Sequence, residues 1–426
     1  MRPRSAGLLL LSLALPLTLA TSASAAKVRV VWWDPYGPPF SEPTKAMIAS
    51  FNKSHPNINV VREIGGGSDV AKLAIAMTSG KGPDCAHVFA SWNASQLWAM
   101  GLSRPLDAFM AGDKKLWDQV YPAFMDSLKF RGKQLALPDT AQSHMLYWNK
   151  DMFSQAGLDP KHAPSFEELD LYAFKLTKKT SEGKLVTVGM NPAGAWIPWG
   201  GFQAWAALFG GQLFDAAREK VTADSDANLK ALRWIDDFMK THGGYAALGS
   251  GGSIESGKVA MQLDPHYIMK FISATKKPIN YMIGLPPAPG GLGGGRGPMT
   301  SLNCNMVLRS SKHPAEAYEF LKFFVTNGGW MQPDTPDASP NRVLNEKFTP
   351  PLSVPEGAWK AVALKVLDMA EPAISMPGAE RYIEALNAGF FAVAQGKQSP
   401  EQALQAAQIA GEKRFAEALK RARWGK

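Results

Sequence analysis

Cysteines and long apolar runs are scarce in this sequence, which restricts both its redox chemistry and its topology. Of 426 residues only two are cysteines, Cys85 and Cys304. An oxidising compartment would permit a bridge between them, but the sequence cannot place the two sulfurs within bonding distance. After the N-terminal region, no stretch reaches the roughly 20 consecutive apolar residues that a bilayer-spanning helix needs. We therefore expect a protein that is not embedded in a membrane.

The motifs that usually mark an enzyme or a cofactor site are also missing. The sequence has no His-Glu-x-x-His run, no Gly-x-Ser-x-Gly elbow, no Gly-x-x-x-x-Gly-Lys-Ser/Thr loop and no Cys-x-x-Cys pair. The glycine-rich tract at 290–297 misses the dinucleotide spacing, because Pro298 stands where the third glycine should be. The seven histidines are spread singly, so we expect neither a metal site nor any other cofactor.

The charged residues show no pattern of nucleic-acid binding. Lys and Arg number 46 against 37 Asp and Glu, which gives a formal net charge of +9. Apart from the tail at 420–426 the basic residues are scattered, whereas a nucleic-acid site needs a basic stripe with elements that read the bases. The tail itself is typical of a solvated helix end, where cations favour the helix dipole.

The N-terminal segment has the pattern of a secretory signal peptide. Arg2 and Arg4 precede an apolar run at 7–20, and Ala-Ser-Ala at 23–25 supplies the small residues that a signal peptidase cleaves. The run is too short to span a bilayer, and no cysteine lies near the cleavage site to accept a lipid. We expect cleavage near Ala25 and release of a soluble protein into the periplasm.

The chain after the signal alternates strand-like and helix-like segments. Alternation of this kind predicts parallel strands with helices on both faces of a sheet. Runs of β-branched and aromatic residues predict the strands, and helical spacing of apolar residues predicts the helices between them. In chain order we expect a strand at 28–33, a helix at 44–54, a strand at 58–64, a helix at 70–79 and a strand at 84–89.

The glycine loop at 65–67 has two interpretations. It opens a helix, so its free amide groups could hold an anion. Alternatively it is a flexible turn, in which Ser68 or Asp69 caps the following helix.

The second half of the chain is organised differently. Helical periodicity with acidic first turns predicts helices at 167–178 and 226–240, and a tract rich in proline and glycine predicts a boundary at 286–298. After this boundary we expect a strand at 299–308, a helix at 314–326, and a long final helix at 400–423 that Ser399 caps.

The order of short motifs along the chain resembles the family 1 extracellular solute-binding proteins of ABC importers, which include maltose-binding and glycerol-3-phosphate-binding proteins. Each motif alone is weak, but their shared order over nearly the whole mature chain is specific. They include Phe51-Asn-Lys-Ser-His-Pro56 and Thr78-Ser-Gly-Lys-Gly-Pro-Asp84, with further matches at 30–33, 132–138, 146–158, 164–168, 257–261, 315–324 and 339–342.

The resemblance implies an α/β, two-lobed periplasmic-binding-protein fold of type II. Its domains are discontinuous in sequence, because the chain crosses between the lobes at hinge segments that absorb backbone rotation. We expect the signal peptide at 1–25, lobe 1 at 27–139 plus 300–335, and lobe 2 at 140–299 plus 336–426. The crossings should lie near 138–143, 299–303 and 332–342.

The expected ligand contacts combine this resemblance with the shape of a sugar. A pyranose has one apolar C–H face and a rim of hydroxyls, so its site needs flat rings and short polar side chains. With 13 Trp, 21 Phe and 9 Tyr, the sequence is rich in rings. Asp34 could instead organise its own turn, and Arg342 could anchor a crossing to a carboxylate. The expected contacts are Asp34, Tyr36, Ser91, Trp92, Gln142, His144, Trp196, Trp199, Asp264, Tyr267, Asn303 and Arg342, with His266 and Arg381 as further candidates.

The resemblance thus implies a monomeric receptor that captures a sugar, an oligosaccharide or a polyol and delivers it to an ABC permease. An alternative is a glycerol-3-phosphate or glycerophosphodiester receptor, which would need a cation and helix N-termini at one end of the cleft. A secreted polysaccharide hydrolase would need two carboxylates roughly 5 to 10 Å apart across the cleft. Asp34 and Asp264 are the one pair that the sequence offers for that role.

Overall fold

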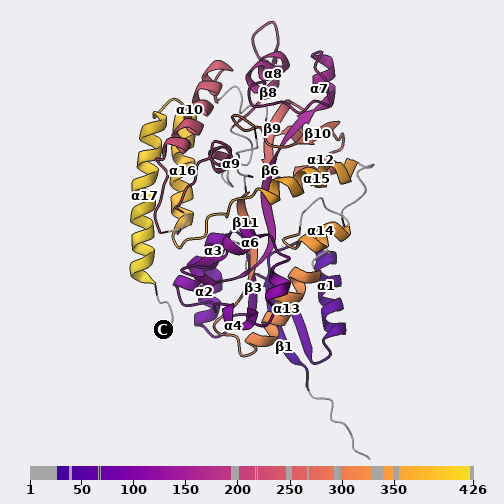
Figure 1. The fold of residues 1–426 in the computed structure, drawn as a ribbon, viewed down its shortest axis with the longest axis vertical. Coiled ribbons are helices and arrows are strands. Elements are labelled where there is room, and N and C mark those ends of the chain that lie inside the picture. Colours follow the sequence, from indigo (N-terminus) through magenta and orange to yellow (C-terminus); the bar gives the residue numbers. More distant parts are fainter. Residues whose placement is uncertain are drawn as a thin grey trace, which may run out of the picture.

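The structure is a computed structural model, and it describes a chain folded into two halves stacked along the long axis (Figure 1). We call the half that contains β1 (Val28–Asp34), β2 (Ile58–Ile64) and β3 (Cys85–Val88) lobe 1, and the half that contains β8 (Leu185–Met190) and β9 (Val259–Pro265) lobe 2. The described residues are 26–37, 41–65, 67, 69–192, 201–215, 217, 219–245, 252–265, 268–291, 297, 299–327, 339–348 and 355–422.

Lobe 1 is built on the predicted alternation of strands and helices, which the structure confirms. β1 pairs in parallel with β2 on one side and with β3 on the other. The connecting helices α1 (Ser41–Ser54) and α2 (Val70–Thr78) cross in opposite directions, and right-handed crossovers therefore place them on opposite faces of the sheet. Asp69 caps α2 through the amide of Lys72, so the capping interpretation of the glycine loop is confirmed.

The core of lobe 1 forms where aromatic side chains from the sheet and two helices meet. Trp32 of β1 lies 5.3 Å from Phe320, and Phe320 lies 5.3 Å from Phe51 of α1, both as edge-to-face pairs. Phe320 belongs to α13 (Pro314–Asn327), the predicted helix that follows the strand β11 (Met299–Val307). The indole N–H of Trp32 donates to Asn305 of β11, which satisfies its one polar group inside the core.

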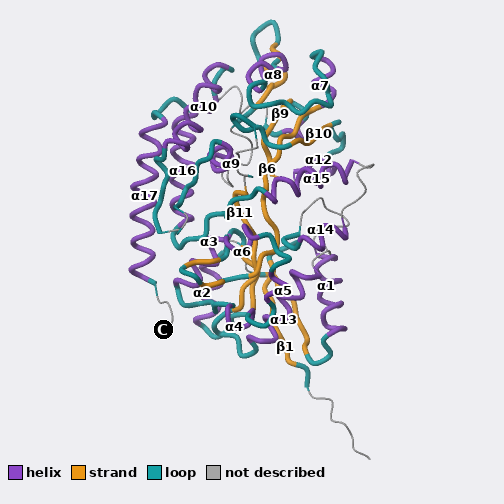
Figure 2. The backbone as a smooth tube through the Cα atoms, in the orientation of Figure 1, coloured by secondary structure: helices purple, strands orange, loops and turns teal. Residues whose placement is uncertain are grey.

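The strand β6 (Leu137–Asn149) connects the two lobes. Its first half pairs with β11 in lobe 1, and its second half pairs with β9 and with β10 (Tyr281–Gly284) in lobe 2. Thirteen residues in a strand extend over roughly 43 Å, which is long enough to traverse both halves. The result is a nine-stranded sheet in the order β2-β1-β3-β11-β6-β9-β8-β7, with β7 (Lys178–Lys179) at the far edge and β10 beside β6. Figure 2 shows β6 running through the middle of the molecule, with β9 and β10 at its lobe 2 end.

Helices cover the lobe 2 part of this sheet and extend along one side of the molecule. α16 (Ala379–Ala394) and α17 (Pro400–Arg421) pack against each other and lie along the side where the C-terminus is marked (Figure 1). Ser399 caps α17 in a reciprocal capping box with Gln402, as predicted. The other lobe 2 helices are α7 (Lys150–Gln155), α8 (Leu169–Leu176), α9 (Gly201–Leu208), α10 (Asp226–Thr241), the 3-10 helix η2 (Ile254–Ser256), α12 (Ile268–Ala274) and α15 (Pro355–Asp368).

The remaining short elements decorate lobe 1. Among them, α14 (Arg342–Phe348) lies beside residues 119–121, since the Arg342 amide donates to Gln119 and its guanidinium lies over the Tyr121 ring. The other short elements of lobe 1 are α3 (Ser91–Ala99), α4 (Asp107–Met110), α5 (Lys114–Trp117), α6 (Pro122–Asp126), β4 (Lys129–Phe130) and β5 (Lys133–Gln134).

α15 packs against β6 and β10 in lobe 2. The limits of the lobes stay a prediction, and most of the predicted crossing at 332–342 lies outside the described residues.

Both cysteines are buried and free. They lie on the neighbouring strands β3 and β11, but Cys304 pairs with Val88 and Cys85 pairs with Val307. An offset of three residues separates their Cα atoms by roughly 10 Å, which is too far for a disulfide. None of the described helices combines the length and the apolar character that crossing a bilayer requires.

Candidate functional site

The carboxyl ends of β1, β2 and β3 form one edge of lobe 1, where three loops meet. Because the strands are parallel, the chain leaves all of them at this edge. Tyr36 follows β1, Gly67 follows β2 and Phe89 follows β3. The Gly67 amide donates to the His87 carbonyl at 3.0 Å, and its own carbonyl accepts from the Phe89 amide at 3.2 Å. The loops are therefore joined by backbone hydrogen bonds, and we refer to this region as the strand edge.

A buried ion pair closes the end of β1. Asp34, the last residue of β1, accepts a hydrogen bond from Nε of Arg62 on β2 at 2.6 Å, and the same guanidinium donates to the Tyr36 carbonyl. The second oxygen of Asp34 accepts from the Tyr36 amide at 3.3 Å. Burial raises the pKa of Asp34, against the opposing pull of His87 and Arg62. Asp34 thus organises the turn that carries Tyr36, one of the two roles considered for it.

A second buried pair lies beneath the Tyr36 ring. Nε2 of His87 and an oxygen of Asp139 are 2.7 Å apart, and both side chains are fully buried. The Tyr36 hydroxyl donates to the same Asp139 oxygen at 3.4 Å, and its ring centroid lies 4.8 Å from that of His87. Among the described residues, Nδ1 of His87 and the other Asp139 oxygen have no hydrogen-bond partner. His87 comes from β3 and Asp139 from β6, so the pair joins the strand edge to a crossing strand.

Asn303 of β11 completes this cluster. Its amide nitrogen donates to the Tyr36 hydroxyl at 3.3 Å and to the Thr140 hydroxyl at 3.2 Å, while its oxygen accepts from the Ala90 amide at 3.4 Å. The structure therefore brings together three predicted contact residues, Asp34, Tyr36 and Asn303. Tyr36 supplies a half-buried phenol ring at the end of the parallel strands, Asp34 bonds to its backbone amide, and Asn303 bonds to its hydroxyl.

Ser91 and Trp92 begin α3 beside this cluster. The Ser91 hydroxyl is buried and donates to the Ile374 carbonyl, and the Trp92 ring is part of the hydrophobic core. Ala90, which precedes the helix, has a φ of 63° and gives α3 no side-chain cap. The Ser91 and Trp92 side chains are thus used internally, whereas the first amides of α3 have no capping side chain.

The lobe 2 end of β6 carries a separate polar group. His144 pairs with Pro265 and Met145 with Asp264, so His144 and Asp264 lie near the point where β6 enters lobe 2. Burial raises the pKa of Asp264 well above its usual range, and the nearby Glu255 carboxylate adds to this. Within the described chain, one Asp264 oxygen and both polar atoms of the Gln262 side chain lack hydrogen-bond partners.

The other predicted residues are not brought to this cluster by any described contact. Arg342 is exposed, with its guanidinium carbon 4.8 Å from the centre of the Tyr121 ring, and Arg381 pairs with Glu384 at 2.7 Å. The side chain of Gln142 and residues 196, 199, 266 and 267 lie outside what the structure describes, so Trp196, Trp199, His266 and Tyr267 stay predictions.

Sequence reasoning missed four members of the cluster: Arg62, His87, Phe89 and Asp139. Asp139 stands inside the predicted crossing at 138–143, and this position was the available signal. His87 is one of seven histidines spread singly along the sequence, but a histidine within an apolar strand needs a polar partner once it is buried. No pattern in the sequence pairs it with a residue 52 positions away.

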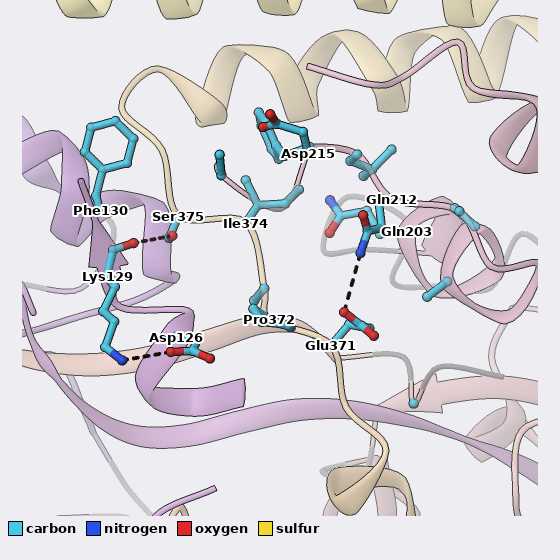
Figure 3. A pocket seen from close by; sticks show the side chains of 18 of the residues that line it. Asp126, Lys129, Phe130, Gln203, Gln212, Asp215, Glu371, Pro372, Ile374 and Ser375 are labelled. Atoms are coloured by element: carbon cyan, nitrogen blue, oxygen red, sulfur yellow. Dashed lines mark hydrogen bonds and ion pairs between the residues drawn. The ribbon is translucent and has the colours of Figure 1, made fainter. Parts of the chain in front are cut away.

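A pocket of about 400 Å³ lies between the lobes (Figure 3). None of the predicted residues that the structure describes lines it, although the Ser91 hydroxyl donates to the carbonyl of Ile374, which does. Residues 126–132 of lobe 1 form one wall, residues 203–215 of lobe 2 form another, and the segment 371–375 runs between them. In Figure 3 the Gln212 amide reaches the Glu371 carboxylate at 3.5 Å, and Lys129 pairs with Asp126 at 2.9 Å. Among the described residues, no three His, Cys, Asp or Glu side chains group as metal ligands would.

Similar proteins of known sequence carry the names of binding proteins. A binding protein of Brucella abortus (strain 2308) is 25% identical over 410 residues, covering 91% of this chain and 93% of its own. A mannitol-binding protein of Pseudomonas aeruginosa PAO1 is 26% identical over 241 residues, 52% of each chain. The sn-glycerol-3-phosphate-binding periplasmic protein of Yersinia pseudotuberculosis (strain IP32953) is 26% identical over 244 residues, 54% of each chain.

Solved structures of similar proteins share the fold. The mannobiose-bound protein CpMnBP1 aligns with a TM-score of 0.72 at 25% identity, covering 91% of this chain and all of its own. The cyclic α-maltosyl-1,6-maltose binding protein of Arthrobacter globiformis aligns with a TM-score of 0.77 at 20% identity, covering 92% and 100%. These matches confirm the expected two-lobed α/β fold. The sequence pattern of bacterial extracellular solute-binding proteins matches residues 35–329, and the chain belongs to that family.

Proposed function

We propose that this protein is exported to the periplasm, captures a neutral sugar, oligosaccharide or polyol between its lobes, and delivers it unchanged to an ABC permease. The observation that carries the proposal is the half-buried Tyr36 at the carboxyl ends of parallel strands. Asp34 and Arg62 hold its backbone, and Asp139 and Asn303 bond to its hydroxyl. A fixed aromatic ring with polar neighbours suits the apolar face and hydroxyl rim of a sugar. CpMnBP1 with mannobiose and the mannitol-binding protein support this class of ligand.

The charges at the strand edge favour a neutral ligand. Arg62 and His87 are the cationic or potentially cationic side chains in the described cluster, and each faces a carboxylate. A phosphate group would need a cation with free hydrogen-bond donors. The hydroxyl groups of a sugar or polyol are neutral and need no such cation.

One observation favours a second candidate, a glycerol-3-phosphate receptor. The helix α3 begins at the strand edge without a side-chain cap, and uncapped helix amides attract anions. The relative in Yersinia pseudotuberculosis carries the name of such a receptor. A screen of neutral sugars, polyols and glycerol 3-phosphate separates the two candidates.

The proposed mechanism is closure of the lobes around the ligand. β6 crosses from one lobe to the other and β11 pairs with it at the crossing, so a change of backbone angle there would move the lobes relative to each other. A ligand that contacts both lobes only in the closed form stabilises that form by its differential affinity. Trp199 and Tyr267 are our candidates for a facing aromatic wall in lobe 2. The permease would recognise the closed monomer.

The test is a thermal-shift screen of the mature chain with mannobiose, maltotetraose, mannitol and sn-glycerol 3-phosphate. A ligand at 100 times its dissociation constant adds about 2.7 kcal/mol to stability, which a melting curve detects. A shift with a neutral sugar or polyol supports the proposal. A shift with glycerol 3-phosphate alone would favour the second candidate. Hydrolysis of the oligosaccharides, detected by mass spectrometry, would refute both candidates.

The Tyr36→Ala variant locates the site. Loss of a ring that contacts ligand should weaken binding by about 1 to 3 kcal/mol, measured by titration calorimetry. Tyr172→Ala is the matched control, because Tyr172 is also half-buried with a hydroxyl bonded to a carboxylate, but belongs to α8 in lobe 2. Equal affinity of the wild type and Tyr36→Ala would remove Tyr36 from the site.

A further inference from the structure

Tyr36 is held more firmly than a loop residue usually is. Its amide donates to Asp34, its carbonyl accepts from Arg62, and its hydroxyl bonds with both Asp139 and Asn303. The ring packs against both His87 and Phe89, whose ring centroids are 4.8 and 5.9 Å away. A side chain at a loop normally keeps rotational freedom, so contacts on every polar group and on the ring restrict it to one orientation.

The hydroxyl end of Tyr36 is attached to the crossing strands. Asp139 belongs to β6 and Asn303 to β11, and Asn303 stands opposite Thr140 in the register of these strands. The ring itself stands at the strand edge, on the loop after β1. Tyr36 therefore links the candidate ligand site to the two strands at the point where β6 leaves lobe 1.

The Asp139 carboxylate is the acceptor on which this attachment depends, and His87 is its main partner. Both side chains are fully buried, so neither can touch a ligand that binds to the exposed side of the Tyr36 ring. Burying an ion pair rarely stabilises a fold, because the cost of removing two polar groups from water offsets their attraction. The presence of this buried pair is therefore better explained by its role in fixing the Tyr36 ring than by a contribution to stability.

We propose that His87 and Asp139 are a positioning pair: they hold the Tyr36 ring in its orientation and connect it to β6, and they set ligand affinity without touching the ligand. This inference rests on the proposed function of the strand edge as part of a ligand site. Lobe 1 also contains a comparable group with no such role, in which Asp113 accepts from the Tyr318 hydroxyl and from Lys322, both at 3.2 Å. Tyr318 lies in the core on α13 and serves as the structural counterpart.

The first measurement needs no ligand. In protein labelled with ¹³C at the tyrosine ε carbons, the Tyr36 resonance is assigned by its absence in Tyr36→Ala. Asp139→Asn should shift and broaden this resonance, because the ring loses its charged acceptor, and Asp113→Asn should leave it unchanged. An unaltered Tyr36 resonance in Asp139→Asn would overturn the proposal.

The second measurement is a double-mutant cycle on affinity for whichever probe of the screen binds the wild type. Asp139→Asn should weaken binding about tenfold or more, since a hydrogen bond to a charged group is lost, while Asp113→Asn binds normally. In the Tyr36→Phe background, which lacks the hydroxyl, Asp139→Asn should have little further effect. Additive effects would show that Asp139 acts independently of Tyr36 and would overturn the proposal.

The two measurements also separate this inference from the proposed function. If no probe binds the wild type but Asp139→Asn alters the Tyr36 resonance, the positioning pair stands and the ligand class is wrong. If a probe binds with equal affinity to the wild type and Asp139→Asn, the function stands and the positioning role is refuted. Melting curves of both aspartate variants identify any general loss of folding.

Discussion

Two glycines with the same φ angle differ in how much space their surroundings leave for a side chain. Gly67 and Gly80 both have a φ of 73°, a left-handed conformation that disfavours residues with a Cβ atom. A Cβ added at Gly67 would lie 3.0 Å from Cβ of Pro35 and 3.2 Å from the Phe89 ring, whereas one at Gly80 would meet nothing within 4 Å. Gly67 therefore combines a backbone requirement with a packing requirement at the strand edge.

We expect Gly67→Ala to be more damaging than Gly80→Ala. The left-handed conformation alone should cost about 1 kcal/mol in Gly80→Ala. Gly67→Ala should cost roughly 1 to 3 kcal/mol more, because Pro35 and Phe89 must move. Urea unfolding of the two variants measures the difference directly. Equal losses would mean that the loops at the strand edge accommodate the methyl group freely.

The burial of Asp264 disfavours the ionised form of its carboxyl group. Its carboxyl group is buried in lobe 2, and both burial and the Glu255 carboxylate raise its pKa. The folded protein therefore holds this proton more tightly than the unfolded chain does. As pH rises above the unfolded pKa, the unfolded state ionises first, and the free energy of unfolding falls until the folded-state pKa is passed.

We expect Asp264→Asn to stabilise the protein at pH 8 by about 1 kcal/mol or more. At that pH the unfolded wild type is ionised, so folding must either bury the charge or take up a proton, and the neutral amide avoids both costs. At pH 4, where the folded protein keeps Asp264 protonated, the gain should largely disappear. Melting curves at both pH values test this. Asp69→Asn, which exchanges one helix-capping residue for another, is the control and should show no such pH-dependent gain. An equal gain in stability at pH 4 and pH 8 would refute the raised pKa of Asp264 as its cause.

At the scale of elements, α16 and α17 depend on glycines where helices come close. A Cβ at Gly411 of α17 would lie 2.6 Å from the Tyr382 ring and 2.9 Å from Val221. Tyr382 cannot easily retreat, because it is buried and its hydroxyl donates to the Leu213 carbonyl at 3.0 Å. At Gly389 of α16, the added atom would lie 3.2 Å from Ala403, a smaller conflict.

The prediction for this helix pair reverses the usual preference for alanine over glycine. Within a helix, Gly→Ala normally stabilises by about 1 kcal/mol. Gly411→Ala should nevertheless destabilise the protein by about 1 to 3 kcal/mol through overpacking. Gly389→Ala, its matched control in α16, should stay within about 1 kcal/mol of the wild type. The midpoints of denaturant unfolding provide the comparison, provided that the dependence of the unfolding free energy on denaturant is unchanged. A stabilised Gly411→Ala would disprove the packing argument.

At the scale of the whole molecule, the lobes share both a sheet and a core. β6 belongs to the lobe 1 and lobe 2 parts of one nine-stranded sheet. A single hydrophobic cluster includes Trp32 of β1 and Trp205 of α9, which lie in different lobes. α17 also contacts α10 of lobe 2 and α3 of lobe 1. Loss of either lobe would therefore expose apolar surface of the other.

We expect both lobes to unfold in one cooperative step despite the size of the chain. Differential scanning calorimetry of the mature protein should give one endotherm, with a calorimetric enthalpy close to the van't Hoff value. A ligand found in the screen should move this single peak upward as a unit. Two resolved peaks, of which the ligand moves only one, would show that the lobes are thermodynamically independent.

Local features of the sequence were enough to predict the first three strands of lobe 1 with the helices between them, the helices at 226–240, 314–326 and 400–423, and the cap at Ser399. For the helix that starts at Val70 they named Asp69 as one of two capping candidates. Periodicity, capping chemistry and turn residues act over a few positions, so they are readable without the fold. The order of motifs also indicated the family. Tertiary structure alone decided which polar groups meet. His87 bonds to Asp139 across 52 positions and Asn303 to Tyr36 across 267, because β11 and β6 follow β3 in the sheet. Strand order depends on the packing of the entire chain, and no local pattern in the sequence encodes it.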